Sequence, residues 1–254
     1  MISIISPAKS MNFDSVDSNI FFTELEEFDE TKKLLTELKT LSKVKLKKIM
    51  KISDKLAELN FLRYQKFESL PAKQAILAYD GDVYSNIDKK TFSHEVLRFS
   101  QDHVRIVSGF YGLIRPLDKI RAYRLEMSIK LAKNAPKGLD RLWQEKITRK
   151  LNNDLKTHEN KYLINLASNE YASAIDRKLL EVPMINIHFR EFRDGVIKNI
   201  ALNSKRARGM VVDYIVRNNL DVPEEIKNFN NSCYEFNLKL SNESNYFFVK
   251  NYGS

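Results

Sequence analysis

The amino-acid sequence predicts a mixed α/β fold, of the α+β kind, in a single domain that spans residues 1–254. Short apolar or β-branched runs, which are typical of buried strands, intermix with longer segments of helical periodicity. The chain contains no internal repeat, low-complexity tract or Pro/Gly-rich linker at which it would divide into domains. Strands and helices do not alternate in a steady rhythm, which argues against a doubly wound sheet or a TIM barrel.

The first part of the chain predicts one strand followed by helices. Residues 2–5 form a short apolar run that ends at a turn, as a buried strand does. Leucines recur at helical spacing over residues 24–41, and a second helix continues over residues 46–50. Ser53 is placed to cap a third helix, so the segment before residue 70 should be mainly helical.

The middle of the chain predicts strands and helices in turn. Residues 75–79 are apolar throughout and favour a buried strand, which would deliver Asp80 and Asp82 to a loop at its end. Residues 93–103 favour a helix and residues 104–107 a strand. Farther on, apolar residues at every fourth position from Trp143 to Leu155 indicate an amphipathic helix, followed by a strand at 162–166.

The last part of the chain predicts two hairpins and one helix. Apolar and polar residues alternate over 185–189, and the turn residues Asp194 and Gly195 lead into a second strand at 196–202. Ser204 can cap the helix that follows. Alternation over 234–240 and again over 247–249 indicates a closing hairpin.

Composition points to a cytosolic protein with an anionic partner. The chain has 42 Lys and Arg against 33 Asp and Glu, a formal net charge of +9, which favours polyanions such as nucleic acids. A single cysteine, Cys233, allows no intramolecular disulfide, and the N-terminus lacks the basic and apolar regions of a secretory signal. No apolar run approaches the roughly 18–20 residues needed to cross a bilayer, so no membrane contact is expected.

The sequence predicts no metal site and no cofactor. The four histidines are widely separated along the chain, and none stands in a ligand motif or beside the cysteine. Direct iron chelation by a dedicated His/Cys site is therefore disfavoured, while a carboxylate site stays open. The histidines are His94, His103, His158 and His188.

The most informative segment, residues 105–127, contains four arginines and two of only seven glycines. The Gly-x-x-Gly at Gly109 and Gly112 lets backbone N–H groups approach an anion closely because no Cβ stands in the way. A helix beginning after Pro116 would add its N-terminal dipole. This is how a helix-hairpin-helix holds a DNA phosphate without reading base sequence. The competing interpretation is that the glycines only form a tight turn.

Several motifs, taken in order, resemble one bacterial family over essentially the whole chain, the YaaA peroxide stress proteins. The motifs are Ser6-Pro7-Ala8-Lys9, Ile52-Ser53-Asp54-Lys55-Leu56-Ala57, Gly81-Asp82-Val83-Tyr84, Ser108-Gly109-Phe110-Tyr111-Gly112, Arg115-Pro116-Leu117-Asp118, Tyr123-Arg124-Leu125-Glu126-Met127, Asn165-Leu166-Ala167-Ser168 and Ala207-Arg208-Gly209. Phe110 and Ser10 stand where the family pattern has Leu and Thr, and both changes are conservative.

The resemblance implies a cytosolic protein that protects bacteria from hydrogen peroxide by keeping unincorporated iron low. It also implies a single-domain fold unlike the common superfolds, with a helix-hairpin-helix-like element and a basic cleft that binds DNA largely without sequence specificity. The expected DNA-binding residues are Arg105, Ser108, Gly109, Tyr111, Gly112, Arg115, Arg121, Arg124, Lys205, Arg206 and Arg208. Further residues expected in the cleft are Lys55, Tyr84 and Ser168.

The alternative function is an enzyme that acts on a nucleotide or a nucleic-acid phosphodiester. The motifs place polar side chains at strand ends and turns, where functional residues concentrate. The catalytic candidates are Lys9, Asp82, Asp118 and Glu126. If the carboxylates converge, they can serve as general acid and base or bind Mg²⁺. The competing interpretation of these residues is a set of caps and ion pairs. A deep pocket that contains a motif lysine and carboxylates would favour chemistry, whereas a broad basic groove over 105–124 would favour binding alone.

Overall fold

The core of the protein is an eight-stranded β-sheet. The computed structural model describes residues 1–14, 20–26, 29–193 and 195–251. Along the sheet the strands are β11 (Tyr234–Phe236), β12 (Asn245–Asn251), β9 (Met184–Arg193), β8 (Leu163–Asn165), β1 (Ile2–Ile5), β5 (Val104–Ser108) and β6 (Gly112–Ile114), with β10 (Val196–Lys198) paired to β9. The mixed α/β class is thus confirmed.

The five central strands, β12, β9, β8, β1 and β5, all run parallel. In the middle, Ile4 of β1 stands opposite Arg105 of β5 and Asn165 of β8. Every residue of β1, β5 and β8 is buried, as expected for parallel strands that are covered on both faces. Because the strands are parallel, the loops that leave them gather at one end of the sheet. We call this the carboxyl end and the opposite one the amino end.

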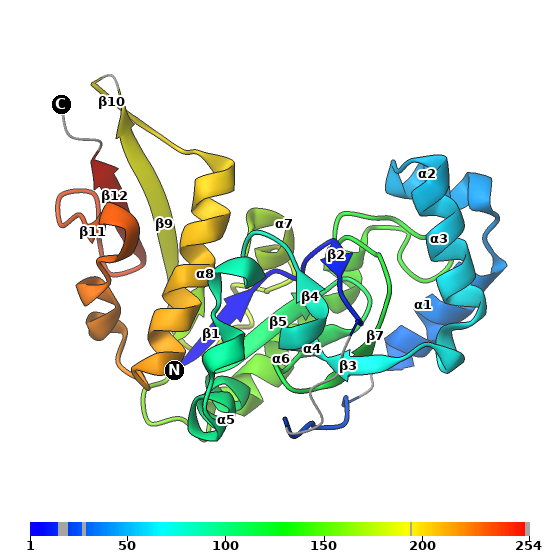
Figure 1. The fold of residues 1–254 in the computed structure, drawn as a ribbon, viewed down its shortest axis with the longest axis horizontal. Coiled ribbons are helices and arrows are strands. Elements are labelled where there is room, and N and C mark those ends of the chain that lie inside the picture. The colour runs from blue at the N-terminus through cyan, green and yellow to red at the C-terminus, as the bar shows by residue number, and fades with distance from the viewer. Residues whose placement is uncertain (15–19, 27–28, 194, 252–254) are drawn as a thin grey trace.

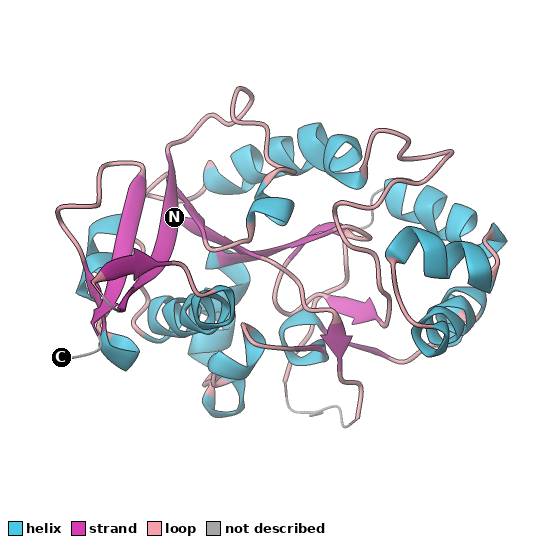
Figure 2. Cartoon of the chain, turned by 90° about the horizontal axis from the view of Figure 1, so that it is seen from above, coloured by secondary structure: helices cyan, strands magenta, loops and turns pink. Residues whose placement is uncertain are grey.

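Helices cover both faces of the central strands (Figure 2). Helix α5 (His94–His103) contacts β1 and β5, and packs against α8 (Ala201–Arg217), which contacts β9. Helix α6 (Leu139–Leu155) buries Trp143 and contacts β6. The long helix and the 93–103 helix are therefore confirmed, the latter with Ser93 as its N-cap.

A group of three helices lies on the opposite side of the molecule from β11 and β12 (Figure 1). These helices are α1 (Asp29–Thr40), α2 (Lys43–Met50) and α3 (Asp54–Gln65), and Ser53 caps α3 as predicted. Two small antiparallel ribbons connect the group to the sheet. They are β2 (Ser10–Met11) with β4 (Tyr79–Asp80), and β3 (Ala72–Gln74) with β7 (Lys119–Arg121). The shorter helices are α4 (Ala75–Ala78), α7 (Asn169–Ala172), η1 (Phe67–Ser69), η2 (Tyr84–Asn86), η3 (Lys89–Thr91), η4 (Pro223–Asn228) and η5 (Asn231–Cys233).

Three local predictions were wrong. Residues 75–78 form the helical turn α4 rather than a strand, and only Tyr79 of the predicted segment lies in a strand, β4. The N–H groups of Ala75 and Ile76, at the start of the turn, donate to the carbonyls of Asp118 and Pro116. A short buried apolar run does not distinguish the two structures. No helix begins after Pro116, where the chain instead turns into β7. Ser204 lies inside α8, which begins three residues earlier.

Both predicted hairpins are confirmed, but two of their strands are shorter than predicted. Strand β10 ends at Lys198 and α8 begins at Ala201, and β11 ends at Phe236. Strands β9 and β10 pair antiparallel around Gly195, whose φ of 76° suits glycine, while Asp194 lies outside the described residues. Strands β11 and β12 pair antiparallel near the C-terminus. Within the described residues, every helix is too short or too polar to cross a membrane.

Candidate functional site

Two adjoining hollows form a groove at the carboxyl end of the sheet, between α2 and the segment 124–130. The first has a volume of about 560 Å³ and the second about 480 Å³, and Ser128, Lys130 and Glu170 line both. The first is also lined by Lys9, Ile49, Met50, Lys51, Arg124, Glu126 and Ile129, and the second by Lys137, Gly138, Asp140, Arg141 and Ser173. The groove thus contains six cationic side chains and three carboxylates.

Parallel pairing explains why distant parts of the sequence meet here. Lys9 lies in the loop after β1, and Glu170 lies just beyond the loop after β8. The two loops are joined because the Ser168 N–H donates to Ser6 Oγ at 2.9 Å. Ligand sites in sheets of parallel strands commonly lie outside the carboxyl ends of adjacent strands. The groove occupies that position.

The most tightly connected charges of the groove surround Glu126. Its Oε1 accepts from Nε of Arg124 at 3.0 Å and lies 3.6 Å from Nζ of Lys9. The Glu126 side chain is only 10% exposed, whereas that of Lys9 is 66% exposed. Oε2 of Glu126 is buried and has no hydrogen-bond partner within the described residues. Arg124 and Glu126 therefore form a fixed, partly buried pair, and Lys9 extends from it into solvent.

The second carboxylate of the groove is held by the backbone. The N–H and the hydroxyl of Ser128 donate to Oε1 of Glu170 at 3.1 and 2.9 Å. Lys51, Lys130, Lys137 and Arg141 are exposed. Sequence analysis did not select these four cations or Ser128. The only signal was position, since Ser128 directly follows the motif that ends at Met127.

A layer of buried tyrosines supports this segment. The hydroxyl of Tyr64 donates to the carbonyl of Arg124. The Tyr123 hydroxyl lies 2.7 Å from the hydroxyls of both Tyr79 and Ser108. Burial raises the pKa of Tyr123 to about 12, so it remains a neutral hydrogen-bonding group at physiological pH. These tyrosines hold the floor of the groove in place.

The bend at Gly109–Gly112 is a β-hairpin between β5 and β6, which corrects the expectation of a helix-hairpin-helix. Ser108, Phe110 and Tyr111 are buried, and the Ser108 hydroxyl already accepts from the N–H groups of Phe110 and Tyr111. A Cβ at Gly109 would lie 2.5 Å from the carbonyl oxygen of Leu125. A Cβ at Gly112 would lie 2.7 Å from the ring of Trp143. The glycines thus serve close packing, and the bend offers no free amides at the surface.

The other cations expected to bind DNA do not gather around this bend. Arg105 is buried against Asp154 at 2.7 Å, and Arg115 pairs with Asp118 at 3.0 Å. Nε of Arg121 donates to the carbonyl of Leu70. Lys205 and Arg206 are exposed on α8, while Nε of Arg208 is buried without a partner within the described residues. Of the eleven expected DNA-binding residues, only Arg124 lines the groove.

The remaining candidates divide in the same way. Lys9 and Glu126 meet in the groove, whereas Asp82 and Asp118 do not line it. Asp118 is 2% exposed and accepts from the Arg115 N–H and the Thr23 hydroxyl, so it anchors a turn. Lys55 is exposed on α3 and does not line the groove. Tyr84 is buried, and its hydroxyl donates to the carbonyl of Ser6. Ser168 lies in the loop after β8, which its N–H joins to Ser6.

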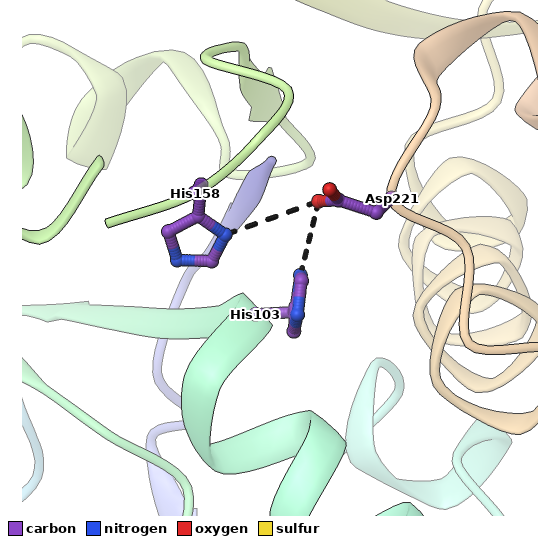
Figure 3. A group of neighbouring side chains, drawn as sticks. All are labelled: His103, His158 and Asp221. Atoms are coloured by element: carbon purple, nitrogen blue, oxygen red, sulfur yellow. Dashed lines mark ion pairs between the residues drawn. The ribbon is translucent and has the colours of Figure 1, made fainter. Parts of the chain in front are cut away.

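A different cluster lies at the amino end of the sheet, where His103, His158 and Asp221 point toward one another (Figure 3). Nδ1 of His103 is 3.4 Å and Nδ1 of His158 is 3.8 Å from Oδ1 of Asp221. Burial lowers the pKa of both imidazoles, that of His158 to about 4. Separation along the chain had argued against a histidine site, yet the fold brings these two histidines together. Among the residues that the structure describes, His103, His158 and Asp221 form a group whose donor atoms are close enough together to hold a metal ion.

Comparison with known proteins gives one consistent result. A family model described as peroxide stress protein YaaA matches residues 1–240. The chain is 43% identical over 250 residues to a UPF0246 protein of Rickettsia bellii (strain OSU 85-389), covering 98% of this chain and 100% of the relative. It is also 43% identical over 249 residues to a UPF0246 protein of Francisella philomiragia, covering 96% and 98% of the two chains.

Proposed function

Since the chain belongs to the family of the peroxide stress protein YaaA, we propose that it acts in the cytosolic response to hydrogen peroxide, where it limits free intracellular iron and binds DNA largely without sequence specificity. The groove, not the Gly109–Gly112 bend, is the proposed DNA-binding surface. The observation that carries this assignment is the row of exposed cations that lines two adjoining hollows.

The charges of the groove suit a phosphate backbone. Two of its carboxylates are already engaged, Glu126 by Arg124 and Lys9, and Glu170 by Ser128. Lys9 and Arg141 are exposed but lie near the carboxylates of Glu126 and Asp140, at 3.6 and 3.9 Å. The exposed lysines that remain available to phosphates are Lys51, Lys130 and Lys137. Side chains that contact phosphates rather than base edges give affinity without sequence specificity. The binding should therefore depend strongly on salt.

Charge reversal tests this proposal. The variant Lys9→Glu/Lys51→Glu/Lys130→Glu should bind duplex, bubble and single-stranded DNA much more weakly, as measured by fluorescence anisotropy at two salt concentrations. Its slope of log Kobs against log[salt] should fall by about 0.9 for each lost contact with duplex phosphate. The control Lys90→Glu/Lys178→Glu/Lys239→Glu changes the net charge equally at exposed lysines outside the groove lining. Equal losses in both variants would reject the groove as the binding surface.

The iron-limiting role needs a separate test in cells. Bacteria that lack the protein should contain more chelatable iron after peroxide treatment, as measured by whole-cell electron paramagnetic resonance with an iron chelator. Complementation with the wild-type chain should restore the low level. Complementation with Lys9→Glu/Lys51→Glu/Lys130→Glu tests whether DNA binding and the control of iron depend on the same surface. An unchanged iron level in the deletion strain would reject this role.

One observation favours the alternative function, an enzyme acting on a phosphate ester. Lys9, Arg124 and Glu126 converge in a hollow of about 560 Å³, within the range that small-molecule sites occupy. In hydrolysis of such an ester, Glu126 would accept a proton from the attacking water and Lys9 would donate one to the leaving oxygen. Incubation with nucleotides and oligonucleotides, followed by product analysis, tests this idea. Turnover that is retained in Glu126→Gln would exclude this assignment.

A further inference from the structure

We propose that His103, His158 and Asp221 form a binding site for one divalent transition-metal ion at the amino end of the sheet. The residues come from three segments, the last residue of α5, the loop between α6 and β8, and the loop after α8. The site lies at the opposite end of the sheet from the groove. It is argued from its own geometry and does not depend on the proposed function.

The separations between donor atoms are close to those of a metal site. Zinc lies about 2.0–2.2 Å from imidazole nitrogen and carboxylate oxygen, so two ligands of a tetrahedral ion are roughly 3.3–3.5 Å apart. Oδ1 of Asp221 lies 3.4 Å from Nδ1 of His103 and 3.8 Å from Nδ1 of His158. One donor atom from each residue lies within 4.8 Å of the other two. Small loop adjustments would bring all three onto one ion.

The donor set is chemically selective. Imidazole favours Zn²⁺, Fe²⁺ and related first-row ions over Mg²⁺ or Ca²⁺, and two histidines with one carboxylate leave coordination positions open. The His103 and His158 side chains are 15% and 8% exposed, whereas that of Asp221 is 26% exposed. The two imidazoles are thus largely removed from water, and the carboxylate is the most exposed of the three ligands.

Neighbouring side chains orient the donors. The His103 ring stacks on Phe99, with centroids 3.9 Å apart and the planes within 6°. Nδ2 of Asn160 donates to Oδ2 of Asp221 at 3.2 Å, which leaves Oδ1 facing the histidines. Such contacts with the groups behind the ligands fix their orientation at metal sites. Ring stacking and the amide contact therefore pre-arrange two of the three donors.

The amino group of Met1 shares this cluster. It pairs with Asp221 and lies 3.3 Å from Nδ1 of His158. Nδ1 of His103 donates to the Met1 carbonyl at 2.9 Å, so this nitrogen must give up that proton and that hydrogen bond when it binds a metal ion. Without a metal ion, the ammonium supplies the positive charge that balances the carboxylate. A bound divalent ion would take over that role, and the amine, once it has lost a proton, could serve as a fourth nitrogen donor. Metal binding should accordingly release protons.

Cobalt provides a test on the unmodified sequence, with nothing added before Met1. Metal-stripped protein is titrated with CoCl₂ and followed by visible absorption and by NMR of the histidine rings. We expect one Co²⁺ per chain, visible d–d bands, and broadening of the His103 and His158 signals before those of His94 and His188. Absence of stoichiometric binding, or equal broadening of all four histidines, would overturn the proposal.

Conservative variants locate the site. His158→Gln and Asp221→Asn keep polar side chains of similar size, and each should weaken Co²⁺ and Zn²⁺ binding by more than about tenfold, since even the groups behind metal ligands contribute about 10- to 100-fold. His188→Gln is the matched control, because His188 bonds Asn245 and lies outside the cluster. Binding that is unchanged in both cluster variants would overturn the assignment.

Discussion

The two ends of the sheet around β1 present opposite chemistry. At the carboxyl end, the loops after β1 and β8 join the segment 124–130 in a groove with six cationic side chains. At the amino end, two imidazoles with lowered pKa values surround one carboxylate. The carboxyl end thus carries fixed positive charge that suits anions, whereas the amino end carries lone-pair donors that suit a cation. Because three neighbouring strands run parallel, the loops that precede them lie at the amino end and the loops that follow them lie at the carboxyl end.

The two ends also differ in how they are held. The carboxyl end rests on close backbone contacts, with Gly109 packed against the carbonyl of Leu125. The amino end rests on polar contacts among Met1, His103, His158 and Asp221. Substitutions should therefore affect the carboxyl end through packing and the amino end through charge and pH. The predictions below test that difference, beginning with the largest effect.

Gly109→Ala should cause the largest loss of stability. The added Cβ would meet the backbone oxygen of Leu125 at 2.5 Å, and neither backbone can move without shifting the Glu126 segment. We expect unfolding to require about 3 kcal/mol less free energy than in the wild type, measured by urea denaturation. Gly195→Ala is the control, because a Cβ there meets nothing within 4 Å and only the φ of 76° opposes it. Gly195→Ala should lower the free energy of unfolding by about 1 kcal/mol. Equal effects would contradict the packing role of Gly109.

Arg124→Ala should have the next largest effect. The substitution leaves the carboxylate of Glu126 largely buried beside only Lys9. Removing one partner of a fully buried pair costs about 3 kcal/mol or more, so this partly exposed pair should cost about 2 kcal/mol. Adding Glu126→Gln should recover part of the loss in a double-mutant cycle. Lys47→Ala is the exposed comparison, since its partner Asp54 is 86% exposed. Lys47→Ala should lower the free energy of unfolding by less than about 1 kcal/mol. A recovery of zero would show that the pair is not coupled.

The pH dependence of stability should separate the two ends. The pKa of His158 is about 4 in the folded chain against an ordinary 6.5, so the unfolded chain binds more protons between these values. Stability is then fully present above pH 6.5 and falls, on the order of 2 kcal/mol, as the pH drops through 4. Tyr123 behaves oppositely, because its pKa is raised from 10.0 to about 12 and stability falls as the pH rises through that range.

His158→Gln and Tyr123→Phe assign these two slopes. The first should make the acid branch of a urea-denaturation series shallower and leave the alkaline branch unchanged, with a remaining acid slope from His103, whose pKa burial also lowers. The second should make only the alkaline branch shallower, because burial also raises the pKa of Tyr64, Tyr79, Tyr84, Tyr111 and Tyr171. Tyr123→Phe also removes two hydroxyl contacts, so its stability should be lower at every pH. An acid branch that is identical in His158→Gln and the wild type would show that His158 does not contribute to the acid sensitivity.

Local sequence patterns predicted the helices and strands at both ends of the sheet, but not which of their side chains would come together in space. The strand at residues 2–5, the cap at Ser53 and the helical periodicity over 143–155 each depend on residues close in sequence, and all three were confirmed. Lys9 and Glu126 could be selected as candidates, yet their 3.6 Å approach depends on sheet order, which no single segment encodes. The approach of His103 and His158 could not be predicted for the same reason, because the two residues belong to separate elements. The Gly109–Gly112 pattern was misread because a glycine pair suits both anion binding and close packing, and only burial distinguishes them.

Ser6→Ala should have the smallest effect, and it tests the link between the loops that form the groove. The change removes the acceptor of the Ser168 N–H at 2.9 Å and the hydrogen bond that the Ser6 hydroxyl donates to the Ser168 hydroxyl at 3.4 Å, which together should cost about 1 kcal/mol. Because the loops carry Lys9 and lead to Glu170, DNA affinity should fall as well, by less than about fivefold. Ser85→Ala is the control, since that exposed hydroxyl only donates to the Gly81 carbonyl. If urea denaturation and anisotropy do not distinguish the two variants, strand pairing alone positions the loops.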